Sequence, residues 1–219
     1  MSDELSQTGA SRSRPRRERR PPKPLDARAL EDMALAYVAK FATSAGKLSA
    51  YLRRKLRERG WASGDAELIG AEAVAAGEAA AAGLCARFVE LGYVDDAGFA
   101  RMRADSLHRR GMGARRVEAD LNAAGIAAPL RQSVQGGEDV ARAAVLAFAR
   151  RRRFGPYARD GGAAVRGDPA LRHKQMAAFI RAGHGPGESR GLLMMETAAA
   201  AEAWAGEGEG GEDWSFEEE

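Results

Sequence analysis

Residues 91–126 read LGYVDDAGFARMRADSLHRRGMGARRVEADLNAAGI. Two adjacent aspartates near the start precede a helix-like segment, and their carboxylates are suited to accept hydrogen bonds from its free N–H groups. Further on, Val117 and Leu121 stand four residues apart, so they share one face of a helix. Gly125 follows after four more residues, and glycine favours the left-handed conformation that ends helices. The stretch therefore predicts two successive helices.

The spacing of the second helix recurs along the chain. Three segments share it, Leu52-Leu56-Gly60, Val117-Leu121-Gly125 and Gln175-Phe179-Gly183, and their glycines lie 65 and 58 residues apart. Strand-like alternation is not found, β-branched residues are few and alanine is abundant. The sequence therefore predicts an all-α fold of three tandem three-helix repeats that bury their apolar faces on one another.

We place the repeat boundaries at acidic or glycine-rich breaks. Asp95 and Asp96 are suited to cap the first helix of the second repeat, and Gly136 and Gly137 interrupt the chain before the third. A glycine-rich loop is expected at residues 154–168. The division is a disordered basic arm at 1–24, repeats at 25–94, 95–136 and 137–201, and a disordered acidic tail at 202–219.

Charge is distributed unevenly along the chain. The net charge of +3 combines a basic body with a tail, residues 202–219, that carries eight acidic and no basic side chains. A basic body suits an anionic partner such as nucleic acid or a nucleoprotein surface. We interpret the tail as solubilising. The alternative is that its carboxylates, with Trp204, Trp214 and Phe216 among them, fold back on the basic surface and compete with the partner.

Several classes of protein are disfavoured. Cys85 is the only cysteine and no apolar run suits a membrane span or a signal peptide, which predicts a cytoplasmic protein without a disulfide. No nucleotide-binding loop, catalytic group or metal-ligand set is recognised, so we expect no enzyme activity, metal, cofactor or small-molecule substrate. The three histidines, His108, His173 and His184, are interpreted as solvated surface residues.

Clusters of basic side chains are the remaining candidates for function. Each cluster alone is compatible with an ordinary solvated helix face, but their similar placement relative to the helices favours one shared binding surface. Aromatic residues make up only 6% of the chain, so contacts with phosphates or acidic protein surfaces are favoured over sequence readout. The candidate binding residues are Arg53, Arg54, Lys55 and Arg57; Arg109, Arg110, Arg115 and Arg116; Arg150, Arg151, Arg152 and Arg153; and Arg172 and Lys174.

One motif resembles a known family. Residues 91–100, LGYVDDAGFA, resemble the LGYxDDxxFA motif of RecX proteins, and the RRGMG segment at 109–113 follows at the expected distance. Upstream, residues 41–61 are similar to the first unit of that family, and the resemblance extends over residues 34–193. The motif residues to which we assign a structural role are Gly92, Tyr93, Asp95, Asp96 and Phe99.

The resemblance implies an elongated, curved array of helical repeats that settles in the groove of the RecA–DNA filament and bridges its protomers. It implies a regulator that inhibits filament growth, ATP hydrolysis and strand exchange, and the co-protease activity that triggers the SOS response. No catalytic residue is carried over, and we expect a monomer with weak affinity for single- or double-stranded DNA. Two alternatives stay open: a DNA-binding helical protein without sequence specificity that acts independently of RecA, and a helical scaffold for other proteins.

Overall fold

The computed structural model describes residues 23–62 and 69–206 of the 219-residue chain. Within these ranges the structure is helical apart from one isolated β-bridge, between Leu25 and Trp61, so the predicted all-α fold is confirmed. Most of the two expected disordered segments, residues 1–22 and 207–219, lies outside the described residues. Residues 202–206, expected in the acidic tail, instead end a helix, because Ala201 and Trp204 pack on a hydrophobic core.

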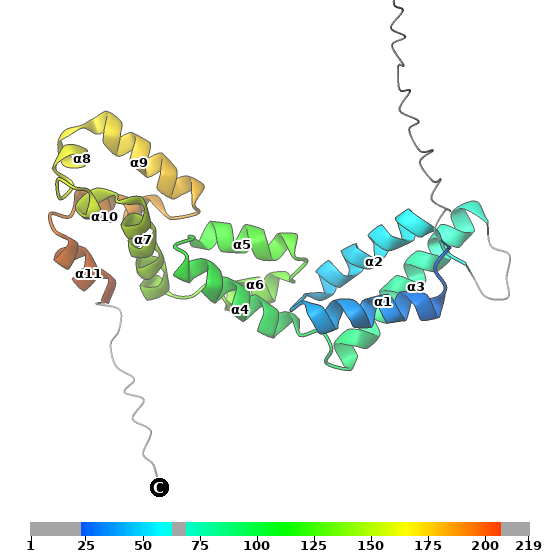
Figure 1. Cartoon of the computed structure of the whole chain (residues 1–219). Coiled ribbons are helices and arrows are strands. Elements are labelled where there is room, and N and C mark those ends of the chain that lie inside the picture. The colour runs from blue at the N-terminus through cyan, green and yellow to red at the C-terminus, as the bar shows by residue number, and fades with distance from the viewer. Residues whose placement is uncertain (1–22, 63–68, 207–219) are drawn as a thin grey trace, which may run out of the picture.

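The described residues form eleven α-helices and one 3-10 helix, in three groups along an elongated molecule (Figure 1). The first group holds α1 (Ala27–Lys40), α2 (Ala45–Arg59) and α3 (Gly70–Glu90). The second holds α4 (Asp96–Arg109), α5 (Ala114–Ala123) and α6 (Ala128–Ser133). The third holds α7 (Glu138–Arg152), the 3-10 helix η1 (Gly155–Tyr157), α8 (Ala163–Gly167), α9 (Pro169–Arg181), α10 (Pro186–Met194) and α11 (Ala198–Gly206).

Each group has its own hydrophobic core. The apolar residues of the repeated spacing point into these cores, with Leu56 half-buried. Burying one such side chain contributes roughly 1.5–3 kcal/mol relative to leaving it exposed. The best buried members are Leu48, Leu52 and Phe88 in the first core, Val117, Leu121 and Ile126 in the second, and Val145, Phe179 and Leu192 in the third.

Local signals set the helix boundaries. Asp26, Ser44 and Asp95 each accept a hydrogen bond from the backbone N–H three residues ahead, at 2.7, 3.2 and 2.9 Å, which satisfies the first turns of α1, α2 and α4. The glycines of the repeated spacing end their helices with positive φ angles, as predicted, with values of 80° at Gly60, 76° at Gly125 and 92° at Gly183.

The third group contains more helices than the other two. The segment 154–168, expected as a loop, contains η1 and α8, because its apolar residues Pro156 and Val165 are buried. Gln175 replaces an apolar residue of the repeated spacing and is also buried. Its Oε1 accepts a hydrogen bond from the N–H of Gly155 at 3.2 Å, so this polar side chain holds η1 against α9.

The first and second groups meet where the N-terminal end of α2 packs against the C-terminal end of α5. The Ser44 hydroxyl donates a hydrogen bond to the Ala124 carbonyl at 2.6 Å. Asp96, the first residue of α4, accepts a hydrogen bond from the N–H of Ala45 at 2.8 Å. Gly46 lies so close to α5 that a Cβ there would be 2.6 Å from the Ala124 oxygen. A larger residue at Gly46 would therefore push the two helices apart.

The second and third groups meet in the same way, with the N-terminal end of α5 packed against the C-terminal end of α9. The N–H of Gly113 donates to the Ala182 carbonyl at 2.9 Å, and the N–H of Arg115 donates to the Gly183 carbonyl at 3.2 Å. A Cβ on Gly113 would lie 2.3 Å from the carbonyl carbon of Gly183. The free N–H groups of one helix thus meet the free carbonyls of another.

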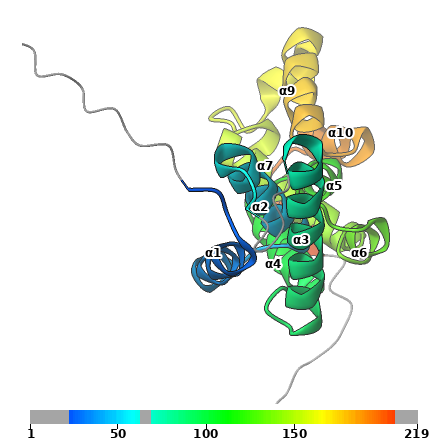
Figure 2. The ribbon, with the colours of Figure 1, turned by 90° about the vertical axis from the view of Figure 1, so that its right-hand side faces the viewer.

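These junctions place α9, α5 and α2 end to end, and we call the three helices the helix line. Figure 1 shows them following one another along one edge of the molecule, and Figure 2, turned by 90°, shows α1 and α6 displaced to opposite sides. At each junction the negative end of one helix dipole meets the positive end of the next, which is favourable. The helix line gives all three groups a common surface.

Candidate binding surface

The helix line is rich in basic side chains. α2 carries six basic residues and one acidic residue, α5 two of each, and α9 three basic residues and no acidic one. A surface of this composition attracts phosphate and carboxylate groups. The exposed basic side chains are Lys47, Arg53, Arg54 and Arg57 on α2, Arg115 and Arg116 on α5, and Lys174 and Arg181 on α9.

The acidic side chains on the helix line are all taken up in ion pairs. The pairs are Glu58 with Lys55, Glu118 with Arg131 and Asp120 with Arg103, each at 2.6 Å. The last pair is bidentate, with a second hydrogen bond of 2.8 Å, and it holds the pKa of Asp120 below its ordinary value. The acidic residues therefore do little to mask the exposed basic side chains.

Three basic side chains act on Asp120 of α5. Arg103 has the largest effect on the pKa of Asp120, and Lys47 and Arg116 lie close enough to lower it further. The ammonium group of Lys47 also lies over the ring of Phe99, 4.9 Å from its centre. Lys47 is not among the predicted binding residues because it stands apart from other basic residues in the chain, and only the fold brings it near Asp120 of α5.

The first predicted cluster lies on the outer part of α2. Arg53, Arg54 and Arg57 are exposed, whereas Lys55 is held in its ion pair. The guanidinium of Arg54 lies over the ring of Tyr51, 5.6 Å from its centre. Arg53 and Arg57 border an apolar pocket between α2 and α3. This cluster therefore presents three charges to solvent rather than four.

The second predicted cluster is divided between two surfaces. Arg115 and Arg116 are exposed in the first turn of α5 and belong to the helix line. Arg109 is exposed at the end of α4 and borders a shallow cavity between α4 and α7. Arg110 is exposed too, and its Nε donates to the Ser106 carbonyl at 3.2 Å. Arg109 thus borders the cavity between α4 and α7, whereas the two arginines on α5 belong to the helix line.

The third predicted cluster, at residues 150–153, is exposed throughout, but its side chains have different contacts. Arg150 forms an ion pair with Glu202 of α11 at 2.6 Å. Arg151 donates to a backbone carbonyl at the end of α4, and Arg152 lies over two phenylalanine rings. Arg153 takes the left-handed conformation, with φ of 55°, at the end of α7. Successive residues on a helix point in different directions, so this run also helps to pack the third group.

The last predicted pair, on α9, has two environments. Arg172 donates to the carbonyls of Val165 and Arg166 at 3.1 and 2.9 Å, which ties α8 to α9. Lys174 is exposed. Arg181 is exposed in the last turn of α9, and it is not among the predicted binding residues because it lies outside the basic clusters of the sequence. Lys174 and Arg181 are therefore the free charges of this helix.

The residues of the LGYVDDAGFA motif lie between the first and second groups. Gly92 has a φ of 73° just after α3, and Tyr93 packs edge-on against an aromatic ring of the first core. Asp95 caps its own helix, α4, whereas Asp96 reaches back to cap α2. Phe99 is buried in the second core. The motif therefore ends one group, starts the next and links the two.

Two of the three histidines contradict the prediction of solvated surface residues. His184 is 2% exposed and His108 is 9% exposed, while His173 is exposed. The Nε2 of His184 donates to the Gly111 carbonyl at 3.1 Å, and burial lowers its pKa. Contacts between the second and third groups cover His184, and they depend on residues far apart in the sequence.

Residues 23–62 and 69–206 offer little to other kinds of site. That part of the chain holds no group of three or more His, Cys, Asp or Glu side chains that could bind a metal ion. None of its helices is long and apolar enough to cross a membrane. Cys85 is a free thiol in the first core, and burial raises its pKa. The exposed charges of the helix line are therefore the strongest candidate for a binding site.

The fold and this surface define a helical-repeat protein with a basic line across its repeats. Residues 95–134 match the family model of the second three-helix domain of RecX, which corresponds to α4–α6. This match agrees with the resemblance of the motif and shows that the second group is similar to a RecX domain. Comparison with curated proteins and with solved structures gives no significant match.

Proposed function

We propose that this protein binds the RecA–DNA filament and restrains its recombinase, ATPase and co-protease activities, and so regulates DNA repair and the SOS response. The RecX match of residues 95–134 supports this proposal. The observation that carries it is the helix line, which runs through all three groups and displays exposed basic side chains while its own acidic side chains are paired. The proposal places the protein in the cytoplasm, together with the filament.

The length of the helix line suits a repetitive partner. Its helices contain 15, 10 and 13 residues. At the rise of an α-helix this corresponds to roughly 60 Å of continuous surface. Such a surface can contact more than one subunit of a filament. Contact with successive subunits would hold them in one arrangement and oppose the changes that accompany subunit addition and ATP hydrolysis.

The contacts are expected to be electrostatic. Arginine and lysine side chains attract phosphates and acidic protein surfaces without reading the base sequence. Exposed charge pairs are screened by salt, so binding should weaken as the ionic strength rises. The protein would therefore act on the filament as a structure rather than at particular DNA sequences.

A DNA-binding protein that acts without RecA is the second candidate. α9 carries three basic residues and no acidic one, a composition that would hold DNA phosphates equally well. The two candidates use the same side chains. They differ in whether binding and its consequences require RecA.

The test is RecA-dependent ATP hydrolysis on single-stranded DNA, with this protein added from substoichiometric to equimolar amounts. One variant reverses an exposed charge on each helix of the line, and these substitutions break no ion pair found in the described residues: Arg54→Glu, Arg116→Glu and Lys174→Glu. The matched control reverses one exposed arginine per group outside the line: Arg28→Glu, Arg101→Glu and Arg190→Glu.

Suppression of hydrolysis by the native chain and by the control variant is expected, with at least about ten-fold weaker suppression by the helix-line variant. Equally weakened suppression by both variants would show that net charge, not the helix line, governs the effect. If the native chain does not suppress hydrolysis at any ratio but binds DNA without RecA, the second candidate is correct.

A further inference from the structure

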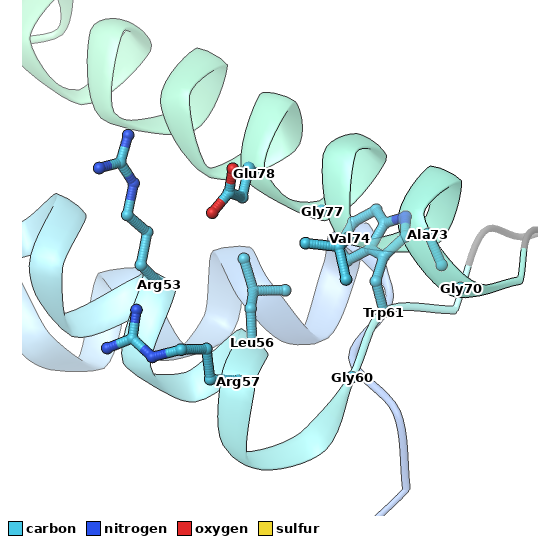
Figure 3. Close-up of a pocket in the computed structure, with 10 residues that line it drawn as sticks. All are labelled: Arg53, Leu56, Arg57, Gly60, Trp61, Gly70, Ala73, Val74, Gly77 and Glu78. Atoms are coloured by element: carbon cyan, nitrogen blue, oxygen red, sulfur yellow. The ribbon is translucent and has the colours of Figure 1, made fainter.

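A pocket between α2 and α3 has an apolar hollow that the proposed function does not use, although Arg53 and Arg57 at its rim belong to the helix line. It has a volume of about 240 Å³ and lies between the end of α2 and the first half of α3 (Figure 3). Its wall is mainly apolar and includes Leu56, Trp61, Ala73 and Val74. It lies within the first group and is separate from the junctions of the helix line.

The apolar wall of the pocket is open to solvent. Val74, which lines the pocket, exposes 61% of its surface. Trp61 packs closely against Gly77 of α3, and a Cβ added to Gly77 would lie 3.0 Å from the Cβ of Trp61. Trp61 nevertheless stays only half-buried. Exposed apolar side chains around a hollow are typical of binding sites.

The rim of the pocket is charged. Figure 3 shows Arg53 and Arg57 of α2 at one end, away from Trp61 and Val74, with Glu78 of α3 near Leu56. Two arginines and one glutamate make this rim basic. The N-terminus of α3 at the other end adds a partial positive charge. The pocket therefore suits a bulky apolar side chain that is flanked by carboxylates.

The three segments of the chain outside the described residues differ in how well they match this composition. Residues 207–219 read EGEGGEDWSFEEE, with seven acidic residues and with Trp214 and Phe216 as the large apolar side chains. Residues 1–22 carry six basic and three acidic residues, so the basic rim repels them. Residues 63–68 read SGDAEL, with two acidic residues but no aromatic side chain. Charge complementarity thus excludes the N-terminal segment, and the two aromatic side chains among seven carboxylates favour the C-terminal one.

The C-terminal segment of the same molecule is too short to reach the pocket. Trp214 stands eight residues beyond Gly206, so an extended chain places it at most about 29 Å from the end of α11. The pocket is separated from the third group by α5, about 15 Å long, and by about 16 Å of α2. Figure 1 shows α11 and the end of α2 at opposite ends of the molecule, so the width of the third group is added to that span.

We propose that the pocket binds the C-terminal segment of a second copy of this chain, with Trp214 or Phe216 in the apolar hollow and the neighbouring carboxylates at Arg53 and Arg57. A tail at one end then meets a pocket at the other, so copies join head to tail in an open-ended manner. The contact is small and therefore weak, which restricts the expected monomer to dilute solution. This inference does not rest on the proposed function.

A fluorescently labelled peptide of residues 207–219 tests the pocket directly, by fluorescence anisotropy on addition of the full-length chain. We expect saturable binding in the micromolar to submillimolar range. The peptide with Trp214→Ala and Phe216→Ala keeps every carboxylate and is expected to bind at least about ten-fold more weakly. Equal binding of the two peptides, or no binding of either, would overturn the proposal.

Substitutions in the pocket test the same contact from the other side. Val74→Glu places a carboxylate at the hollow and is expected to weaken peptide binding at least about ten-fold. Val89→Glu, at a valine on α3 that is 46% exposed and outside the pocket, is the control and should leave binding unchanged. Glu78→Gln should tighten binding about two-fold at low salt. The proposal is wrong if both valine variants bind alike.

Sedimentation of mixed variants distinguishes a head-to-tail contact from a symmetric one. The Val74→Glu chain lacks a pocket, and the chain with Trp214→Ala and Phe216→Ala lacks a tail. Each alone is expected to stay monomeric at concentrations where the native chain associates. Their mixture should form a one-to-one complex, because one partner supplies the tail and the other the pocket; a mixture of monomers would contradict the proposal. RecA is absent throughout, so failure here leaves the proposed function untouched.

Discussion

Gly46 and Gly113 lie where one helix of the helix line begins on the end of another. Gly113 has a φ of −77°, which any residue adopts, so its backbone conformation does not require glycine. The lack of space requires glycine at both positions, because a Cβ on Gly46 or Gly113 would lie less than 3 Å from backbone atoms of the neighbouring helix end. Backbone atoms of a packed helix end cannot move aside as a flexible side chain can. At the scale of residues, two missing Cβ atoms therefore allow the junctions.

Gly113→Ala is expected to lower the free energy of unfolding by about 1–3 kcal/mol, because the new methyl group overlaps the backbone of Gly183. Urea denaturation followed by circular dichroism measures this. Gly83→Ala is the control: it lies inside α3 with no neighbouring atom within 4 Å of its Cβ position, so it should stabilise the protein by about 0.5–1 kcal/mol. Equal effects of the two substitutions would argue against a steric junction.

The buried His184 makes stability depend on pH. Burial lowers its pKa below the ordinary value of 6.5, and the nearby His108 acts in the same direction, while the hydrogen bond to the Gly111 carbonyl and the charge of Glu188 oppose them. The unfolded chain therefore takes up this proton at a higher pH than the folded chain. Stability from this group is complete above about pH 6.5 and is lost as the pH falls through the lowered pKa of the folded state.

The measurement is thermal unfolding of the native chain and of His184→Gln across this pH range. We expect the melting temperature of the native chain to fall more steeply with acidification than that of His184→Gln. His173→Gln, at an exposed position, should retain the native profile. Parallel profiles for the native chain and His184→Gln would show that this proton is not coupled to folding.

At the scale of elements, two adjacent aspartates serve two different helices. Asp95 accepts from the N–H of Gly98 and starts its own helix, α4. Asp96 accepts from the N–H of Ala45, 51 residues earlier, and so caps α2 of the first group. Helix capping by aspartate stabilises by about 1 kcal/mol. One dipeptide thus organises a helix and the junction beside it.

Asp96→Ala and Asp95→Ala should each lower the free energy of unfolding by about 1 kcal/mol, but at different places. Amide hydrogen exchange distinguishes the effects of the two substitutions. Asp96→Ala should accelerate exchange of the Ala45 amide in α2, and Asp95→Ala that of the Gly98 amide in α4. Faster exchange at Gly98 alone in both variants would contradict the link between the groups.

The formation of α11 depends on its contacts with α7. α11 has nine residues, and an isolated helix of that length is marginal in water. The guanidinium of Arg142 on α7 lies 5.3 Å from the centre of the Trp204 ring and donates to the Trp204 carbonyl at 3.2 Å. With the Arg150–Glu202 ion pair, these contacts order a segment that its composition alone assigns to the tail.

At the scale of the whole molecule, end-to-end helices turn separate basic clusters into one surface. Arg115 and Arg116 lie at the junction of α5 with α9, and Lys47 lies at the junction of α5 with α2. We propose that the charges of these three groups, which have separate cores, bind one partner together. Their effect on binding is expected to be collective and dependent on salt.

Binding to the RecA–DNA filament should weaken as salt increases, and Arg115→Gln with Arg116→Gln should reduce that dependence. If both side chains bind phosphates, the slope of log affinity against log salt becomes less negative by about 0.7–0.9 for each arginine replaced. Fluorescence anisotropy of the filament at several salt concentrations measures it. Arg28→Gln with Arg101→Gln is the control, and an equal change of slope there would show a general effect of net charge.

Much of the secondary structure could be predicted because its signals are local. The apolar spacing of Leu48 and Leu52, the capping by Asp95 and the positive φ at Gly125 each depend on residues within one or two helical turns. The candidate surface could be predicted only in part. Lys47 lies apart from the basic clusters in sequence, whereas Arg150 belongs to a cluster but is paired with a residue 52 positions away.

The sequence by itself determined that this protein is helical, where many of its helices end, that its body is basic and that it resembles RecX. These properties follow from composition and short-range spacing, which do not depend on the rest of the fold. Only the tertiary structure decided that α9, α5 and α2 form one line, that His184 is buried and which acidic residues are paired. The physical reason is that those features are contacts between residues far apart in the chain, and no local preference specifies which surfaces will meet.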